Sequence, residues 1–210
     1  MQPWLGNAPL SCRTARLPPR FISTFVDDYG GLVKKSAGIV LFLAAAVGSP
    51  ATAEPAFPVI KGYGGIHSTE GAGERPDKRL RYKLVFNVTK APENPSRINP
   101  SLEKVARFVN LLGADGVRPR RGDVVAIVHG AATPLVLADE AFQTRHRTAN
   151  PNLDLISKLS AAGVEVHVCS QALVGHKIDR GSVDESVRID VGALVTLANL
   201  QLRGYAFMPD

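Results

Sequence analysis

Two side chains of this 210-residue chain could take part in thiol chemistry at one edge of a sheet: the thiol of Cys169 and the imidazole of His129. Each ends a predicted strand, residues 164–169 and 124–129, and the unbroken apolar run of the latter is typical of a strand buried on both faces. The carboxyl ends of parallel strands lie along one edge, where α/β proteins bind their ligands. We therefore expect Cys169 and His129 to face the same edge.

The surroundings of Cys169 favour its reactive thiolate form. Residues 170–173 read as the first turn of a helix. Free backbone N–H groups and the positive end of the helix dipole at such a start stabilise a thiolate. An imidazolium at His129 would act in the same direction. The alternative is a buried structural thiol, which is common for free cysteine.

Two more histidines lie close to the thiol in the sequence. His167 precedes Cys169 by two residues, so both side chains project from the same face of a strand. A metal site made of these two residues and His129 is conceivable, but no CxxC, HxxxH or carboxylate companion supports it. We therefore predict no metal. His176 could line the same crevice, although surface residence fits its context better.

A Cys–His hydrolase is another possible use of these groups. Cys169 would be the nucleophile and His129 the base, with the following helix start as oxyanion site. A carboxylate would orient the histidine, and nothing in the sequence selects one of four candidates: Asp179, Asp184, Glu185 and Asp190.

Strands and helices alternate over the rest of the chain. Further strands are predicted at residues 82–88, 187–191 and 205–208. Helices are predicted at residues 99–113, with Asn99 as N-cap, and at 135–144, 153–162 and 193–203. This alternation predicts an α/β fold, a three-layer sandwich with a mostly parallel central sheet flanked by helices.

Residues 34–53 have the order of a secretory signal peptide. Two lysines precede the apolar residues 39–47, and Pro50 and the triplet Ala-Thr-Ala at 51–53 follow. No polar second face supports the alternative of a buried helix. A translation start at Leu32 or Val33 would give a compact leader and make residues 1–33 a misassigned start. We predict a leader at 1–53, a flexible Gly/Pro-rich arm at 54–79, and one α/β domain at 80–210 in the periplasm, with no membrane contact after signal cleavage.

The composition of the predicted mature part argues against several classes of partner. It would hold 20 basic and 17 acidic residues, a net charge of +3, which is too small to predict nucleic-acid binding. Gly62–Gly65 follow no strand and open no helix, so no nucleotide cofactor is predicted. Cys12 would leave with the leader, so Cys169 would have no disulfide partner within the chain.

Three segments resemble the DsrE/DsrF-like proteins: VVAIVHG at 124–130, GVEVHVCSQAL at 163–173 and LQLRGY at 200–205. The resemblance covers most of residues 82–208. It implies a homo-oligomeric α/β fold, a trimer or hexamer, in which Cys169 carries sulfur as a persulfide and hands it to a partner thiol. The role of His129 comes from strand-end geometry and not from the resemblance. The well-understood sulfur-relay members of this family look cytoplasmic, so for an exported chain the resemblance does not identify the donor or the acceptor.

We therefore predict a periplasmic sulfur carrier, at most a sulfur transferase, with unidentified donor and acceptor proteins and no cofactor. The alternative is a non-catalytic oligomeric binding or scaffold module in which Cys169 is structural. The hydrolase comes third.

Overall fold

Five parallel strands form the centre of the structure, which is a computed structural model describing residues 54–210. The leader predicted at 1–53, with Cys12, lies outside the described residues. The strand order is β4-β3-β2-β1-β5. The strands are β1 (Leu84–Val88), β2 (Val124–Val128), β3 (Glu165–Cys169), β4 (Arg188–Asp190) and β5 (Ala206–Met208).

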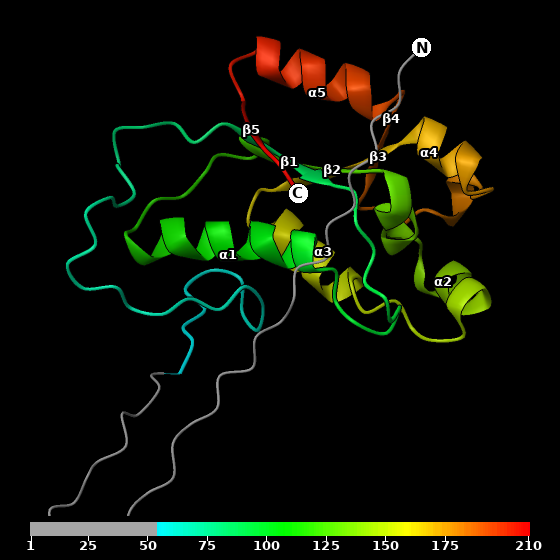
Figure 1. Cartoon of the computed structure of the whole chain (residues 1–210), viewed down its shortest axis with the longest axis horizontal. Coiled ribbons are helices and arrows are strands. Elements are labelled where there is room, and N and C mark those ends of the chain that lie inside the picture. Colours follow the sequence, from blue (N-terminus) through cyan, green and yellow to red (C-terminus); the bar gives the residue numbers. More distant parts are fainter. Residues whose placement is uncertain (1–53) are drawn as a thin grey trace, which may run out of the picture. The chain divides into compact units, whose positions relative to one another are not determined.

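Helices cover both faces of this sheet, which confirms the predicted α/β fold class (Figure 1). One face carries α1 (Pro100–Ala114) and α3 (Leu153–Ala161), and the other carries α5 (Ala193–Leu202). Side chains alternate along each strand, so Val124 and Val128 pack on the α1 side and Ile127 packs on the α5 side. Among residues 54–210, no helix is long and apolar enough to cross a membrane.

The helix predicted at 135–144 was wrong in its bounds. A 3-10 helix, η1 (Gly130–Val136), comes first, and α2 (Asp139–His146) follows. The two are separated because Leu137 forms an isolated antiparallel bridge with Val183, and Ala138 N–H donates to the Ser182 carbonyl at 2.9 Å. This pairing holds the chain extended at Leu137, which no local pattern reveals.

Two short helices follow β3. They are α4 (Ser170–Gly175) and the 3-10 helix η2 (Arg180–Ser182). The start of α4 directly after the last residue of β3 agrees with the helix turn predicted at 170–173.

Part of the Gly/Pro-rich segment lies against the domain. Ile60 is buried in the main core, and the carboxamide of Asn110 on α1 binds the segment's backbone. Its oxygen accepts from Val59 and Ile60 N–H at 2.9 and 2.8 Å, and its nitrogen donates to the Tyr63 carbonyl at 2.8 Å. Residues 59–64 are thereby fastened to α1.

Candidate functional site

Cys169 ends β3 and is the N-cap residue of α4. Its side chain faces α5 and is 7% exposed. It belongs to a small apolar cluster whose buried members also include Val85, Val125, Ile127, Ala193 and Leu200. The thiol is therefore mostly covered.

His129 continues β2 by one residue. Its backbone is extended, with φ −159° and ψ −173°, and its N–H donates to the Val88 carbonyl at 3.0 Å. The register pairs Val128 of β2 with Val168 of β3, so the next positions along the two strands are His129 and Cys169. The two residues come to the same edge and the same face of the sheet. Within residues 54–210, no hydrogen bond joins the two side chains.

Asn87 of β1 is the hydrogen-bond partner of His129. The distance from Asn87 Oδ1 to His129 Nε2 is 2.7 Å. Because an amide oxygen only accepts, Nε2 carries the proton, and Nδ1 of the neutral ring keeps its lone pair. Asn87 was not predicted as a site residue from the sequence. Its signal was one polar residue within the apolar run LVFNV of β1.

The surroundings of His129 favour the neutral ring. Burial lowers its pKa below the usual 6.5, and the charge of Asp210 offsets part of this effect. The Asp210 carboxylate accepts hydrogen bonds from Thr89 N–H at 2.7 Å, from Lys90 N–H at 2.9 Å and from the Ser101 hydroxyl. Burial raises the pKa of Asp210, but these hydrogen bonds outweigh it and lower the pKa to about 2. Asp210 is therefore charged at neutral pH.

His176, which follows α4, reaches the same edge of the sheet. Its Nε2 donates to the carbonyl of Gly130 at 2.8 Å, and Gly130 directly follows His129. This contact joins the end of α4 to the end of β2. The histidine is half-buried and engaged in structure.

His167 belongs to a different group of residues. It is 4% exposed, its Nδ1 is 2.8 Å from Asp190 Oδ2, and its Nε2 is 3.1 Å from Glu165 Oε2. Asp190, one of the four carboxylates considered for the hydrolase, therefore holds His167. Within the described residues no three His, Cys, Asp or Glu side chains are grouped to hold a metal ion.

The edge thus brings together three groups with complementary chemistry. The thiol of Cys169 ends β3, the imidazole of His129 follows the central strand β2, and the Asn87 amide holds the far nitrogen of that ring. A neutral imidazole beside a thiol can accept the thiol proton, which activates sulfur as a nucleophile.

Comparisons with known proteins identify the family of this chain. A family model described as DsrE/DsrF-like family matches residues 82–209. A solved structure titled as a protein of unknown function, MTH1491 from Methanobacterium thermoautotrophicum, is similar with a TM-score of 0.46 and 19% sequence identity. That match covers 61% of this chain and 99% of the other. No curated protein matches the chain.

The electrostatic coupling at this edge predicts a titration result. We expect NMR to give His129 a pKa below 6.5, and Asp210→Asn to lower it further, because a charge that favours the imidazolium is lost. The control Glu70→Gln removes an exposed carboxylate from the segment before β1 and should leave this pKa unchanged. An unchanged or raised His129 pKa in a folded Asp210→Asn protein would contradict the coupling.

Proposed function

The chain belongs to the DsrE/DsrF-like family, and from that premise we propose that it carries sulfane sulfur as a persulfide on Cys169 and passes it to a partner thiol. Family membership suggests a sulfur-relay role. The observation that supports the finer proposal is the position of Cys169, which ends β3 next to the strand that ends in His129. Cys169 is the one cysteine of the described residues.

The proposed transfer consists of two exchanges. The Cys169 thiolate attacks the outer sulfur of a donor persulfide, the S–S bond of the donor breaks, and the donor thiolate leaves with the bonding electron pair. The thiolate of an acceptor then attacks the outer sulfur of the Cys169 persulfide, and Cys169 leaves as a thiolate. The sulfane sulfur keeps its oxidation state, so the cycle needs no redox cofactor.

In this proposal His129 manages the proton. Nδ1 of the neutral ring takes the proton of the Cys169 thiol, and the imidazolium returns it to the departing donor thiolate. Asn87 has a positioning role, because its amide oxygen holds Nε2–H at 2.7 Å and fixes the tautomer. The thiol and the ring share no hydrogen bond within the described residues, so donor binding would have to bring them together.

We further propose that the protein assembles with itself. The outer side of α5 carries the apolar residues Leu194, Ala198 and Leu202, spaced four apart, and the two leucines are 85% and 86% exposed. No charged residue occurs within α5, so a second copy of this helix is a compatible cover.

We also propose that the protein is exported, because residues 34–53 have the order of a secretory signal peptide.

The carrier proposal is tested by intact-mass spectrometry. After incubation with inorganic polysulfide, the protein should gain the mass of one sulfur atom, and dithiothreitol should remove it. Cys169→Ser should gain none. Absence of the gain in a folded wild-type protein would refute the carrier and favour the scaffold alternative, for which Cys169→Ser would leave assembly and phenotype unchanged.

The role of His129 predicts a change in rate. His129→Gln should slow sulfur uptake by about 100-fold, and Asn87→Ala by about 10-fold, because the base is lost or misplaced. The control Asn94→Ala removes an exposed asparagine that bonds only within its own loop, and it should react at the wild-type rate. Equal rates for all four proteins would exclude His129 as the base.

Self-association predicts a change of mass in solution. Size-exclusion chromatography with light scattering should show an oligomer, and the double variant Leu194→Glu/Leu202→Glu should be monomeric, because charges on the apolar stripe would be buried unpaired. Gln201→Glu places the same charge at another exposed position of α5 and is the control. A monomeric wild-type protein would refute this surface.

A further inference from the structure

A cleft of about 510 Å³ lies between α5 and the amino-terminal half of the sheet. Four arginines line it, and we call it the arginine cleft: Arg81, Arg121, Arg188 and Arg203. Three carboxylates also line it, those of Asp123, Glu165 and Asp190. One positive charge is therefore in excess even when His167 at its floor is neutral. Cys169 is not among the lining residues.

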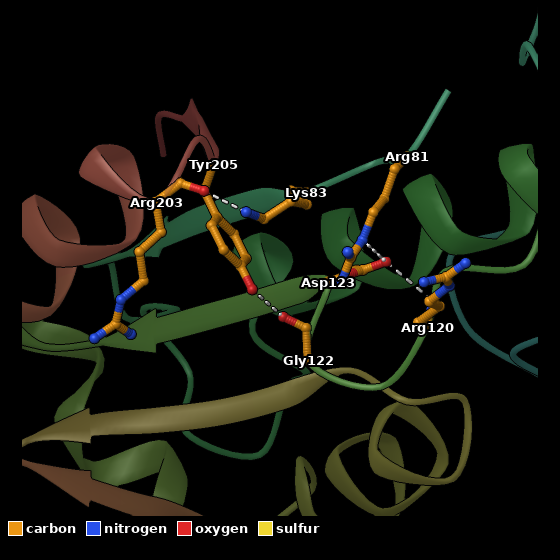
Figure 2. A network of polar contacts seen from close by, with 7 residues as sticks. All are labelled: Arg81, Lys83, Arg120, Gly122, Asp123, Arg203 and Tyr205. Atoms are coloured by element: carbon orange, nitrogen blue, oxygen red, sulfur yellow. Dashed lines mark hydrogen bonds and ion pairs between the residues drawn. The ribbon is translucent and has the colours of Figure 1, made fainter. Parts of the chain in front are cut away.

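The carboxylate of Asp123 is bound by the Arg81 guanidinium and by a backbone N–H group. Its side chain is 2% exposed, and it accepts from the Arg81 guanidinium at 2.7 Å and from Arg120 N–H at 3.3 Å (Figure 2). Burial raises the pKa of Asp123, but the hydrogen bonds from Arg81 and Arg120 outweigh this effect and lower the pKa. Arg81 and Asp123 thus neutralise each other.

The other two carboxylates are engaged by residues of the cleft as well. Asp190 accepts from the Thr196 hydroxyl at 2.9 Å and from Arg188 Nε at 3.1 Å, and it contacts His167 at 2.8 Å. Glu165 faces the second ring nitrogen of His167 at 3.1 Å. Neither carboxylate contacts Arg121 or Arg203 among the described ion pairs.

Two guanidinium groups of the cleft are left without a carboxylate. The side chain of Arg203 has no hydrogen bond or ion pair within the described residues, and Arg121 reaches only the Ser160 carbonyl at 3.5 Å. The backbone next to Arg203 is fixed, because Lys83 donates to the Arg203 carbonyl and the Tyr205 hydroxyl donates to the Gly122 carbonyl at 2.8 Å. Figure 2 shows the Arg203 guanidinium without a partner, beside these contacts.

We propose that the arginine cleft binds a small organic anion whose oxyanion group is held by Arg203 and Arg121. A guanidinium presents paired N–H donors that match a carboxylate, sulfonate or phosphate group. The volume exceeds the space that one inorganic ion needs, and apolar side chains of Val195 and Leu200 line part of the wall. These side chains would contact the organic body of the ligand. The inference does not depend on the chemistry of Cys169.

The test is isothermal titration calorimetry of the full chain with 1-propanesulfonate and with inorganic sulfate at constant ionic strength. We expect propanesulfonate to bind more tightly than sulfate, because only its propyl group can contact the apolar wall. Arg203→Gln and Arg121→Gln should each weaken binding about tenfold or more, because each removes a charge-assisted hydrogen bond. Arg107→Gln, an exposed arginine of α1 outside the cleft, is the matched control and should bind as wild type.

Three results of these titrations would contradict the proposed site or its ligand class. Absence of heat with both anions, or equal affinity of all variants, would overturn the site. Tighter binding of sulfate than of propanesulfonate would overturn the organic-anion assignment and leave an inorganic-ion site. Cys169→Ser should bind the anion as wild type does, so failure of this site and failure of sulfur uptake are told apart. Circular dichroism checks the fold of each variant.

Discussion

The parallel pairing of β2 with β3 is the constraint on which the candidate site depends. Because Val128 pairs with Val168, the residues that follow them end at the same edge and face the same side of the sheet. His129 and Cys169 are forty positions apart in the sequence, and only this register makes them neighbours. A shift by one residue would turn one of the two side chains to the α1 face.

Those parts of the structure that rest on local pattern could be predicted from the sequence. The unbroken apolar run of β2 indicated a buried parallel strand, and Asn99 was predicted as the N-cap of α1. The break before α2 could not be predicted, because it depends on pairing between Leu137 and Val183, far apart in the chain. The residue pattern of a segment reflects its local structure and burial. It does not reveal a bridge to a residue that is distant in the sequence.

The same limit applies to the histidines. His167 and Cys169 project from one face of β3, which made a shared site conceivable, yet their surroundings differ. His167 lies between two carboxylates at the floor of the arginine cleft, whereas Cys169 lies in an apolar cluster at the carboxyl edge. The partner of His129 is an amide from β1 and not a carboxylate, which strand alternation permits but does not specify.

The burial of Cys169 constrains both the carrier and the hydrolase. Either role needs the thiolate to meet its substrate directly, and a side chain that is 7% exposed must first be uncovered for that attack. In a persulfide the transferred atom is the outer sulfur, about 2 Å beyond the cysteine sulfur. That atom would extend past the cover while the inner sulfur stays shielded from oxidation. Once loaded, a carrier would therefore present its reacting atom outside the cover, and the step that requires the cover to open is the uptake of sulfur.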